Sequence, residues 1–345
     1  MRDVALRASV SAKTVSRVFN DDPHVSPATR LRVRAAMDEL GFVPNLMART
    51  FRSGRDMAIG VAVPDVSDPF FANLTRAIEA VAAERGCLVV VASLGNDPAR
   101  ERAGLEALLH RHVVGLVAVP TSDDQSYLAP WMDRTPVVFV DRAPSLVQAD
   151  TFVEDDHGGA LAGTRHLLLH GHRRIVFAGD ALGTPTTRNR LRGYRDAHEE
   201  QGVAVPEHLV RQGHWSDSES PGLLGPLLLD GATAVFSSNA RCTLGVVHAL
   251  HALRRTDVAL VSFGDVALAA ALQPALTALD QDPSALGTAA ATRVFERLDD
   301  PGDPHPRTTV LPVTLLERGS GELPPPAGVG DAPLVPPPGV TGDIA

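Results

Sequence analysis

Between residues 57 and 263 the sequence alternates wholly apolar runs with amphipathic stretches, which restricts the fold more than any other feature. Wholly apolar runs are typical of strands buried on both faces of a parallel sheet, which needs helices on both sides. The pattern runs to about residue 155 and then starts again. We therefore predict an α/β core of two doubly wound subdomains with a cleft between them. The expected strands are 58–63, 88–91, 115–119, 137–140, 174–178, 209–212, 234–236 and 258–263, and the expected helices are 70–85, 99–110, 127–133, 159–169, 188–201, 223–229 and 242–253.

The first 44 residues differ from this core and predict a small helical domain. A short helical run at 3–8 is followed by a tight turn and a second helix at 12–20, for which Ser11 is a good N-cap. A third helix, 27–40, is expected to begin after Ser26 and to end before a glycine. Two short helices joined by a tight turn are typical of the helix-turn-helix unit.

The second of these helices has two contrasting faces. Val15 and Val18 lie on an apolar face, whereas Lys13, Arg17 and Asn20 lie on the opposite face. Lysine, arginine and asparagine are the side chains that read guanine and adenine edges in a major groove. The alternative is an ordinary three-helix packing module with a basic outer surface.

Charge is distributed unevenly along the chain. The net charge is −9, but residues 1–55 hold ten Lys/Arg and five Asp/Glu, so that segment carries +5 and the remainder −14. A basic head on an acidic body is the asymmetry expected of a DNA-binding domain attached to something else. No apolar run approaches the length of a membrane span, and we find no secretory signal, so we expect a cytoplasmic protein.

No organised catalytic set or cofactor motif is recognisable. There is no P-loop and no Gly-x-Gly-x-x-Gly after a strand, so no cofactor is expected. The His110/His112 and His170/His172 pairs lack partners at zinc-ligand spacing, so no metal is expected either. We therefore do not expect an enzyme. A small-molecule-binding enzyme would need catalytic groups in the cleft, and an extracytoplasmic receptor would need a signal peptide.

The segments DVA, TVSRVFN, VSPATRLRV and LGFVPNLMARTF within residues 1–55 together resemble the LacI/GalR family of bacterial transcription regulators. The chain to about residue 318 resembles that family more loosely, including its core, which is similar to periplasmic sugar-binding proteins. The resemblance implies a homodimeric regulator, more a repressor than an activator, that binds a pseudo-palindromic DNA operator. A small-molecule effector, such as a sugar, would bind between the core subdomains and control DNA binding allosterically.

The resemblance also divides the chain. It implies a helix-turn-helix domain at 1–44, a hinge helix and linker at 45–56, and an effector-binding and dimerisation core at 57–318. Within the core, one subdomain would comprise 57–155 with 281–306, and the other 156–280 with 307–318. Residues 319–345 are rich in proline and glycine, which predicts a disordered tail.

The family's DNA-contact positions fall on polar residues of the head and on the hinge. The side chains expected to read base edges in the major groove are those of Ala12, Lys13 and Arg17. Those expected to contact phosphates or fix the register are Ser11, Thr14, Ser16, Asn20, Ser26 and Thr29. Those expected in the minor groove are Asn45, Ala48 and Phe51, with the phenylalanine as a wedge between base pairs.

The effector positions that the resemblance implies are Asp68, Phe70, Phe71, Arg190, Trp215, Asn239 and Asp265. The aromatic rings would stack on a sugar or base, and the guanidinium would suit hydroxyl or carboxylate groups. The alternative is that Phe70 and Phe71 belong to the core and that Arg190 lies on a solvated helix face.

Two departures from the family pattern affect this pocket. Gly264 stands where the family usually has an effector-binding aspartate, and Ala240 stands where it favours another. A pocket without these acceptors is expected to bind polyols poorly. Either the effector is unusual, or the core has lost its response and the chain is an effector-independent regulator.

Replacing Arg17 with alanine tests whether the second helix reads DNA. We expect binding to the specific site to weaken by about fivefold to a hundredfold, with relaxed preference at one position of the site. Binding of the variant to a series of single-base site variants measures this. Equal discrimination between true and scrambled sites by variant and wild type would contradict the assignment.

Overall fold

The computed structural model describes residues 2–19, 22, 24–40, 57–180, 183–300 and 305–326. The chain forms two compact units, Met1–Met57 and Ala58–Ala345, which are considered separately. The expected hinge at 45–56 and residues 327–345 of the expected tail lie outside the described residues. Among the helices that are described, none is long and apolar enough to cross a membrane.

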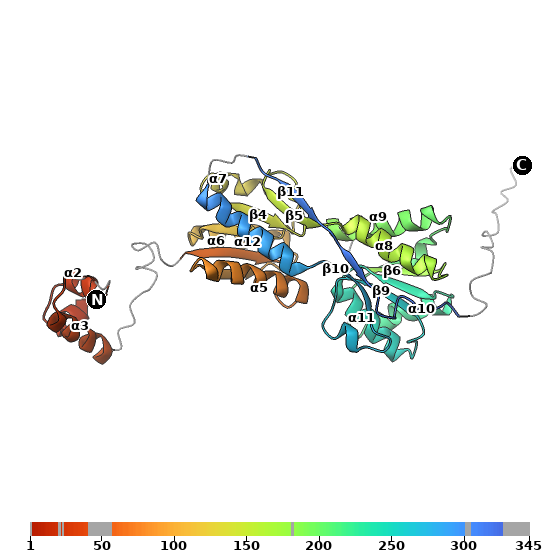
Figure 1. Ribbon diagram of the computed structural model, residues 1–345, viewed down its shortest axis with the longest axis horizontal. Helices are drawn as coiled ribbons and strands as arrows, with labels where there is room; N and C mark the ends of the chain where they lie inside the picture. The colour runs from red at the N-terminus through yellow and green to blue at the C-terminus, as the bar shows by residue number, and fades with distance from the viewer. Residues whose placement is uncertain are drawn as a thin grey trace, which may run out of the picture. The chain divides into compact units, whose positions relative to one another are not determined.

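The head contains the three expected helices, α1 (Arg2–Arg7), α2 (Ala12–Phe19) and α3 (Pro27–Glu39) (Figure 1). Valine and alanine side chains from all three helices form its small core. Val15, Val18 and Val33 are at most 2% exposed, which confirms the expected apolar face of α2 and shows which side of α3 it packs against. Leu40, which follows α3, is 46% exposed.

The turn between α1 and α2 depends on local backbone geometry. Ser9 has a φ of 54°, in the left-handed region that glycine adopts most easily. The Ser11 hydroxyl accepts a hydrogen bond from the Thr14 amide at 3.0 Å, so it caps α2 as predicted. The cap fixes where α2 begins, and therefore which residues lie on its outer face.

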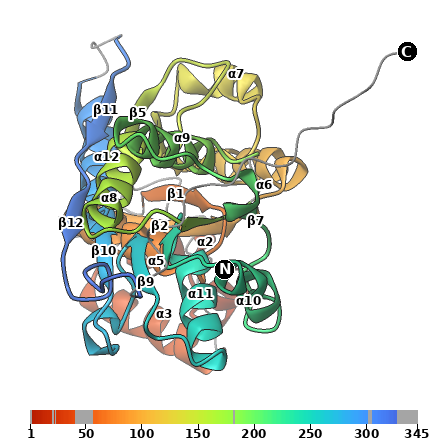
Figure 2. The same cartoon turned by 90° about the vertical axis from the view of Figure 1, so that its right-hand side faces the viewer.

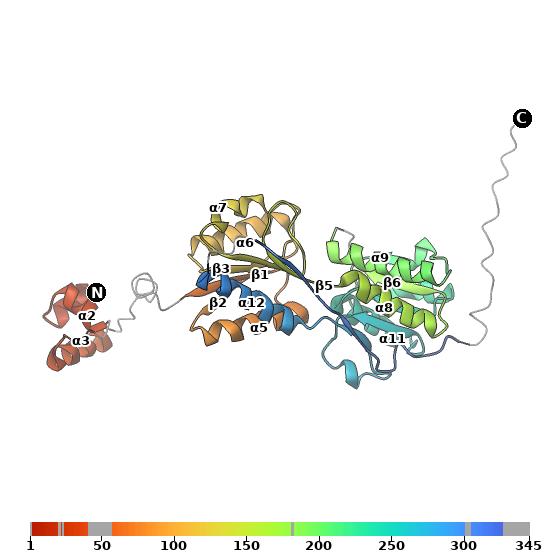
Figure 3. The same cartoon turned by 45° about the horizontal axis from the view of Figure 1, so that its top comes forward.

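The first subdomain contains a six-stranded sheet in the order β11-β5-β4-β3-β1-β2, with every neighbouring pair parallel. Figure 3 shows α6 and α7 on one face of this sheet and α5 and α12 on the other. Its elements are β1 (Ala58–Val63), α5 (Pro69–Glu84), β2 (Leu88–Ser93), α6 (Pro98–His110), β3 (Gly115–Ala118), η1 (Ser126–Leu128), α7 (Ala129–Met132), β4 (Val137–Val140), β5 (Asp150–Glu154), α12 (Pro283–Asp299) and β11 (Thr308–Leu311).

The second subdomain has a sheet in the order β12-β10-β9-β8-β6-β7, parallel except where β12 pairs antiparallel with β10. Helices α8 and α9 cover one face, and α10 and α11 cover the other (Figure 2). Its elements are α8 (Asp156–Leu169), β6 (Ile175–Gly179), α9 (Pro185–Glu200), η2 (Glu207–Leu209), β7 (Val210–Gln212), α10 (Ser220–Leu229), β8 (Ala234–Ser237), α11 (Ala240–Ala252), β9 (Ala259–Phe263), η3 (Ala269–Ala271), β10 (Thr277–Asp280) and β12 (Thr314–Leu316). The predicted fold class is therefore confirmed.

Strands that the sequence pattern did not predict lie where the chain passes between subdomains. These are β5, β10, β11 and β12. Because β11 pairs with β5, residues 308–311 belong to the first subdomain, and the expected division at residue 307 is wrong for them. Strand β12 does belong to the second subdomain.

The prediction that a disordered tail begins at residue 319 places its start too early. Residues 319–326 pack against the second subdomain. The Ser320 hydroxyl accepts a hydrogen bond from the Thr277 amide at 2.8 Å, and Glu322 Oε1 lies 2.6 Å from His166 Nε2. The ring Nε2 of His172 lies 2.8 Å from the Leu323 carbonyl oxygen. These contacts hold residues 319–326 against the second subdomain, although the composition of the segment alone indicates disorder.

Helices α8 and α9 approach each other closely at Gly193. A Cβ atom built at Gly193 would collide with the His157 carbonyl oxygen and lie 2.9 Å from the Leu161 amide nitrogen. Backbone atoms cannot move aside as a flexible side chain can, so this position requires glycine. The contact matters for the cleft because α8 begins with Asp156 and α9 contains Arg190.

We expect Gly193→Ala to destabilise the core by about 1–3 kcal/mol or more, because the methyl group has no space. The matched control is Gly222→Ala, at a helical position with nothing within 4 Å, where alanine should stabilise the helix by about 0.5–1 kcal/mol. Urea unfolding of both variants measures the difference. Equal stability of the two variants would contradict the proposed close contact.

Candidate functional site

One cavity in the core is lined by residues of both subdomains. It lies where the carboxyl ends of parallel strands meet, the usual place for ligands in α/β folds. Its lining consists of Asp68, Phe70, Phe71, Asn96, Asp141, Arg142, Asp180, Thr184, Thr186, Thr187, Arg190, Asn239, Ala240, Arg241 and Gln281. A second cavity of 840 Å³ shares five of these residues, Asn96, Arg142, Asp180, Thr184 and Arg241. The two cavities therefore adjoin each other in the cleft between the subdomains.

Five of the predicted effector residues line the first cavity together: Asp68, Phe70, Phe71, Arg190 and Asn239. Asp68 is the N-cap of α5, and its carboxylate accepts from the Phe70 amide at 3.0 Å. Phe70 and Phe71 meet edge to face with centroids 5.1 Å apart. Phe71 is only 6% exposed, so it serves the core as well as the cavity wall.

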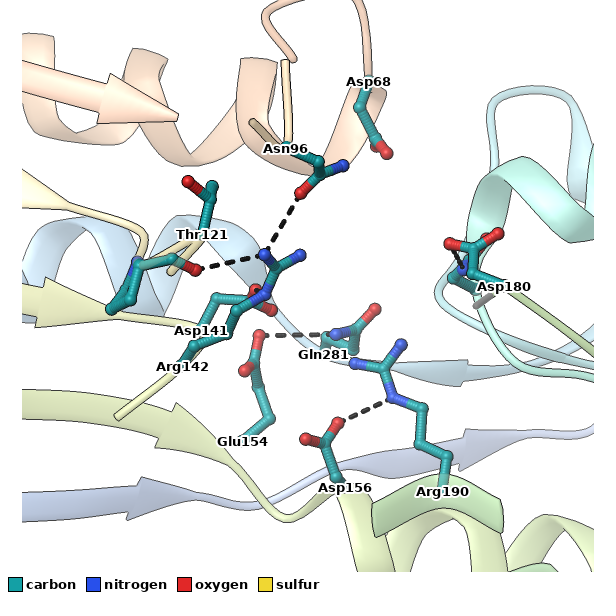
Figure 4. A network of polar contacts seen from close by, with 12 residues as sticks. Asp68, Asn96, Thr121, Asp141, Arg142, Glu154, Asp156, Asp180, Arg190 and Gln281 are labelled. Atoms are coloured by element: carbon teal, nitrogen blue, oxygen red, sulfur yellow. Dashed lines mark hydrogen bonds and ion pairs between the residues drawn. The ribbon is translucent and has the colours of Figure 1, made fainter. Parts of the chain in front are cut away.

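Arg190 is a buried residue and not part of a solvated helix face. Its Nε donates to Asp156 Oδ1 at 2.6 Å, and its Nη1 donates to the Ser238 carbonyl oxygen at 2.7 Å. Its guanidinium carbon lies 3.9 Å from the centre of the Phe263 ring. These contacts hold the guanidinium rigidly beside the cavity (Figure 4).

Two buried carboxyl groups lie behind the cavity wall. Burial raises the pKa of Asp156 to about 6, although its ion pair with Arg190 opposes the rise. Burial, reinforced by Asp141 and Asp156, raises the pKa of Glu154 well above its usual value. Glu154 Oε1 accepts from Gln281 Nε2 at 3.3 Å, and Oε2 has no hydrogen-bond partner among the described residues. Burial therefore disfavours the ionised form of Glu154 relative to a carboxyl group in water.

The opposite wall is organised by Arg142. Its Nη1 donates to Asn96 Oδ1 at 3.2 Å and to the Pro120 carbonyl oxygen at 3.1 Å, while its Nε lies 3.1 Å from Asp141 Oδ2. Figure 4 shows Arg142 beside Asn96 and Thr121. The guanidinium thus joins the ends of three strands of the first sheet, β2, β3 and β4.

Asp180 is a cavity carboxylate without a cationic partner among the described residues. It follows β6, and Asn239 Nδ2 donates to its Oδ2 at 2.7 Å. The Cys242 thiol donates to its Oδ1 at 3.2 Å, and burial raises the pKa of that thiol. The side chain is therefore fixed by neutral donors.

The two departures from the family pattern meet at one corner of an adjoining cavity, which shares Ala240, Phe70 and Gln281 with the first. A Cβ atom built at Gly264 would lie 3.6 Å from the Ala240 Cβ and 3.0 Å from Gln281 Oε1. Gly264 also has a φ of 96°, a conformation that other residues rarely adopt. Any side chain at this position would strain the backbone. The local conformation therefore suits glycine and not the aspartate that the family usually has here.

Two predicted effector residues are not placed as expected. Trp215 borders the larger cavity, but it is 4% exposed and its indole N–H donates to the Gly179 carbonyl oxygen at 3.2 Å, so most of it belongs to the core. Asp265 does not line the first cavity but an adjoining one, which shares Phe70, Ala240 and Gln281 with it. Its two oxygens each accept from Arg318 at 2.7 Å, so its carboxylate already has an ion-pair partner.

The sequence prediction missed several cavity or supporting residues: Asn96, Asp141, Arg142, Glu154, Asp156, Asp180, Arg241 and Gln281. For three of them, Asp141, Arg142 and Asp180, a signal was present because they stand just after predicted strands. Glu154 and Gln281 carried no such signal, because β5, which ends with Glu154, and β10, which Gln281 follows, were not predicted.

On the head, α2 presents exposed Lys13 and Arg17 side chains. Arg17 Nε donates to Asp22 Oδ2 at 2.8 Å, and this contact lowers the pKa of Asp22. The Ser26 hydroxyl accepts from the Thr29 amide at 3.3 Å, which caps α3. The predicted DNA-contact residues outside the described part of the chain are Asn20, Asn45, Ala48 and Phe51.

Each of the two units contains a segment that matches a known protein family. Residues 1–45 match the bacterial regulatory proteins of the lacI family, and residues 164–321 match the periplasmic binding protein-like domain. The ribose operon repressor of Escherichia coli strain K12 is 31% identical over 327 residues, covering 93% of this chain and 99% of the repressor.

Solved structures lead to the same family. The lac repressor dimer bound to operator and the anti-inducer ONPF is 28% identical with a TM-score of 0.73, covering 92% of this chain and 98% of that one. The CelR–cellobiose complex, also 28% identical, has a TM-score of 0.67 at the same coverage. The chain belongs to the LacI family of DNA-binding transcriptional regulators, a family of regulators and not of enzymes.

The buried state of Glu154 predicts how stability depends on pH. A carboxyl whose pKa is higher in the folded than in the unfolded chain stabilises the fold less as pH rises above the ordinary value, here 4.5. Glu154→Gln should therefore melt at a higher temperature than wild type at about pH 8, with little difference at about pH 5.

Exposed Glu199→Gln is the matched control, and its melting temperature should follow that of wild type at both pH values. A Glu154→Gln variant that is less stable than wild type at the higher pH would show that the ionised carboxylate stabilises the fold.

Proposed function

We propose that this chain is a cytoplasmic, homodimeric repressor whose binding to a pseudo-palindromic operator is controlled by a sugar or related metabolite in the interdomain cleft. The observation that carries the proposal is the cavity between the subdomains, where Arg190, Asn239 and Phe70 converge. A few fixed polar groups beside aromatic surface are typical of sites for small hydroxylated ligands. The names of the ribose operon repressor and of the cellobiose complex support the same ligand class.

On DNA, Lys13 and Arg17 of α2 would read base edges in the major groove, with Ala12 beside them. The cap residues Ser11 and Ser26, together with Thr14, Ser16, Asn20 and Thr29, would position the head on phosphates. Asn45, Ala48 and Phe51 would enter the minor groove. The exposed basic side chains of α2 support this orientation.

The free edge of the first sheet supports a homodimer. Strand β2 lies at that edge and exposes Leu88, Val90 and Val91 by 66%, 37% and 42%. An apolar edge strand is a site for pairing or aggregation unless another surface covers it. A second copy of this chain is the proposed cover, as the related lac repressor is a dimer on its operator.

An effector-independent repressor is the second candidate. The corner formed by Gly264 and Ala240 favours it, because two acceptors common in the family are absent there. The two candidates differ in one respect only, which is whether a small molecule changes operator affinity.

Footprinting of the full chain on its own upstream DNA at near-physiological salt tests the proposal. We expect two-fold-symmetric protection with half-sites about one helical turn apart, because a symmetric dimer places its two recognition helices at that spacing. A sugar panel that includes D-ribose and cellobiose should contain a compound that changes the midpoint of protection.

Scrambled DNA is the control, and sedimentation of the protein alone measures the dimer. Linkage requires that a sugar that weakens operator binding is itself bound more weakly by the DNA complex. Protection without any sugar effect supports the effector-independent candidate, whereas a monomer that gives no symmetric protection contradicts both.

A further inference from the structure

The second sheet presents a carboxylate at a different strand end from the one common in the family. Strands β9, β8 and β6 are neighbours in that sheet, and they are followed by Gly264, Asn239 and Asp180. The carboxyl ends of parallel strands meet at one edge. Asp180 therefore lies on the same sheet edge as Gly264, which replaces the usual aspartate of the family. The strands that the two residues follow are two positions apart in the sheet.

Asp180 is fixed in place but keeps free acceptor capacity. Asn239 Nδ2 and the Cys242 thiol each donate to a different oxygen of its carboxylate. A carboxylate offers about four lone-pair sites, so each oxygen can accept a further hydrogen bond. The side chain lines both cavities of the cleft, so a ligand in either one can reach it.

The arginines of the cleft are already matched with carboxylates. Arg142 Nε lies 3.1 Å from Asp141 Oδ2, and Arg190 Nε donates to Asp156 at 2.6 Å. Arg241 reaches across the cleft, with its Nη2 3.8 Å from Asp68 Oδ2. Among the described residues, no arginine forms an ion pair with Asp180, so its negative charge is available to a ligand.

We propose that Asp180 is the effector-binding carboxylate of this chain and that the cleft selects a neutral, hydroxyl-rich ligand over its anionic counterpart. A ligand hydroxyl can donate to the Asp180 carboxylate without bringing in a second negative charge, whereas a ligand carboxylate or phosphate is repelled by Asp180. Each arginine of the first cavity already lies close to a carboxylate of the chain, which weakens its attraction for an anionic ligand. This inference rests on the proposed function and supplies the acceptor that Gly264 and Ala240 lack.

The test uses the full chain and matched neutral and anionic sugars. The pairs are D-ribose with D-ribose 5-phosphate, D-glucose with D-glucuronate, and D-galactose with D-galacturonate, each titrated by calorimetry. We expect at least one neutral member to bind, and its anionic partner to bind at least about tenfold more weakly. This comparison needs only the wild-type protein.

The variant Asp180→Asn keeps the side-chain size and removes the charge. It should weaken binding of the neutral sugar by about tenfold or more, as expected for a hydrogen bond to a charged group, and reduce the preference over the anionic partner. Asp217→Asn, an exposed aspartate of the same subdomain, is the control and should change affinity by less than about twofold.

Three results would overturn the proposal: an anionic partner that binds as well as the neutral sugar, wild-type affinity in Asp180→Asn, or no binding of any neutral sugar. An Asp265→Asn effect as large as that of Asp180→Asn would overturn it too. Operator binding measured in parallel separates this failure from that of the proposed function, because a regulator without sugar binding still protects its DNA.

Discussion

The ion pair between Arg190 and Asp156 holds the rest of the cleft in place. Both side chains are buried, and the pair joins α9 to the start of α8 immediately after the chain enters the second subdomain from β5. Charges removed from water are stable only when their hydrogen bonds are satisfied, and here the Ser238 carbonyl and the Phe263 ring complete the set around the guanidinium. The segment in which the chain passes from β5 into α8 is therefore tied to the cavity wall that contains Arg190.

Close backbone packing supports this arrangement. Gly193 lets α9 lie against α8, so the helices that carry Arg190 and Asp156 keep a fixed separation. Glu154, Gln281 and the ends of β5 and β10 lie beside the same passage, so any reorientation of the two subdomains would also move the buried carboxyl groups. Moving a buried carboxyl group costs less electrostatic free energy when the group is protonated than when it is ionised.

Much of the architecture was predictable because long buried strands and amphipathic helices have strong local patterns. The α2 cap at Ser11 follows from local sequence, and five of the seven residues that the family resemblance implied for effector binding line one cavity. Asp265 lies apart from these five because neighbours in sequence at a strand end can point in different directions, and its carboxylate pairs with Arg318. The packed segment 319–326 was missed because its partners, Thr277 and His172, are far away in sequence.

The sequence by itself determined the class of this protein. Its apolar periodicity, its basic head and the dense resemblance of residues 1–55 to one regulator family each depend on local order along the chain. Only the tertiary structure decided which carboxylates face the cleft, because that depends on how strands distant in sequence are ordered in a sheet. Asp180 and Gly264 are 84 positions apart, yet β8 alone separates the strands that they follow.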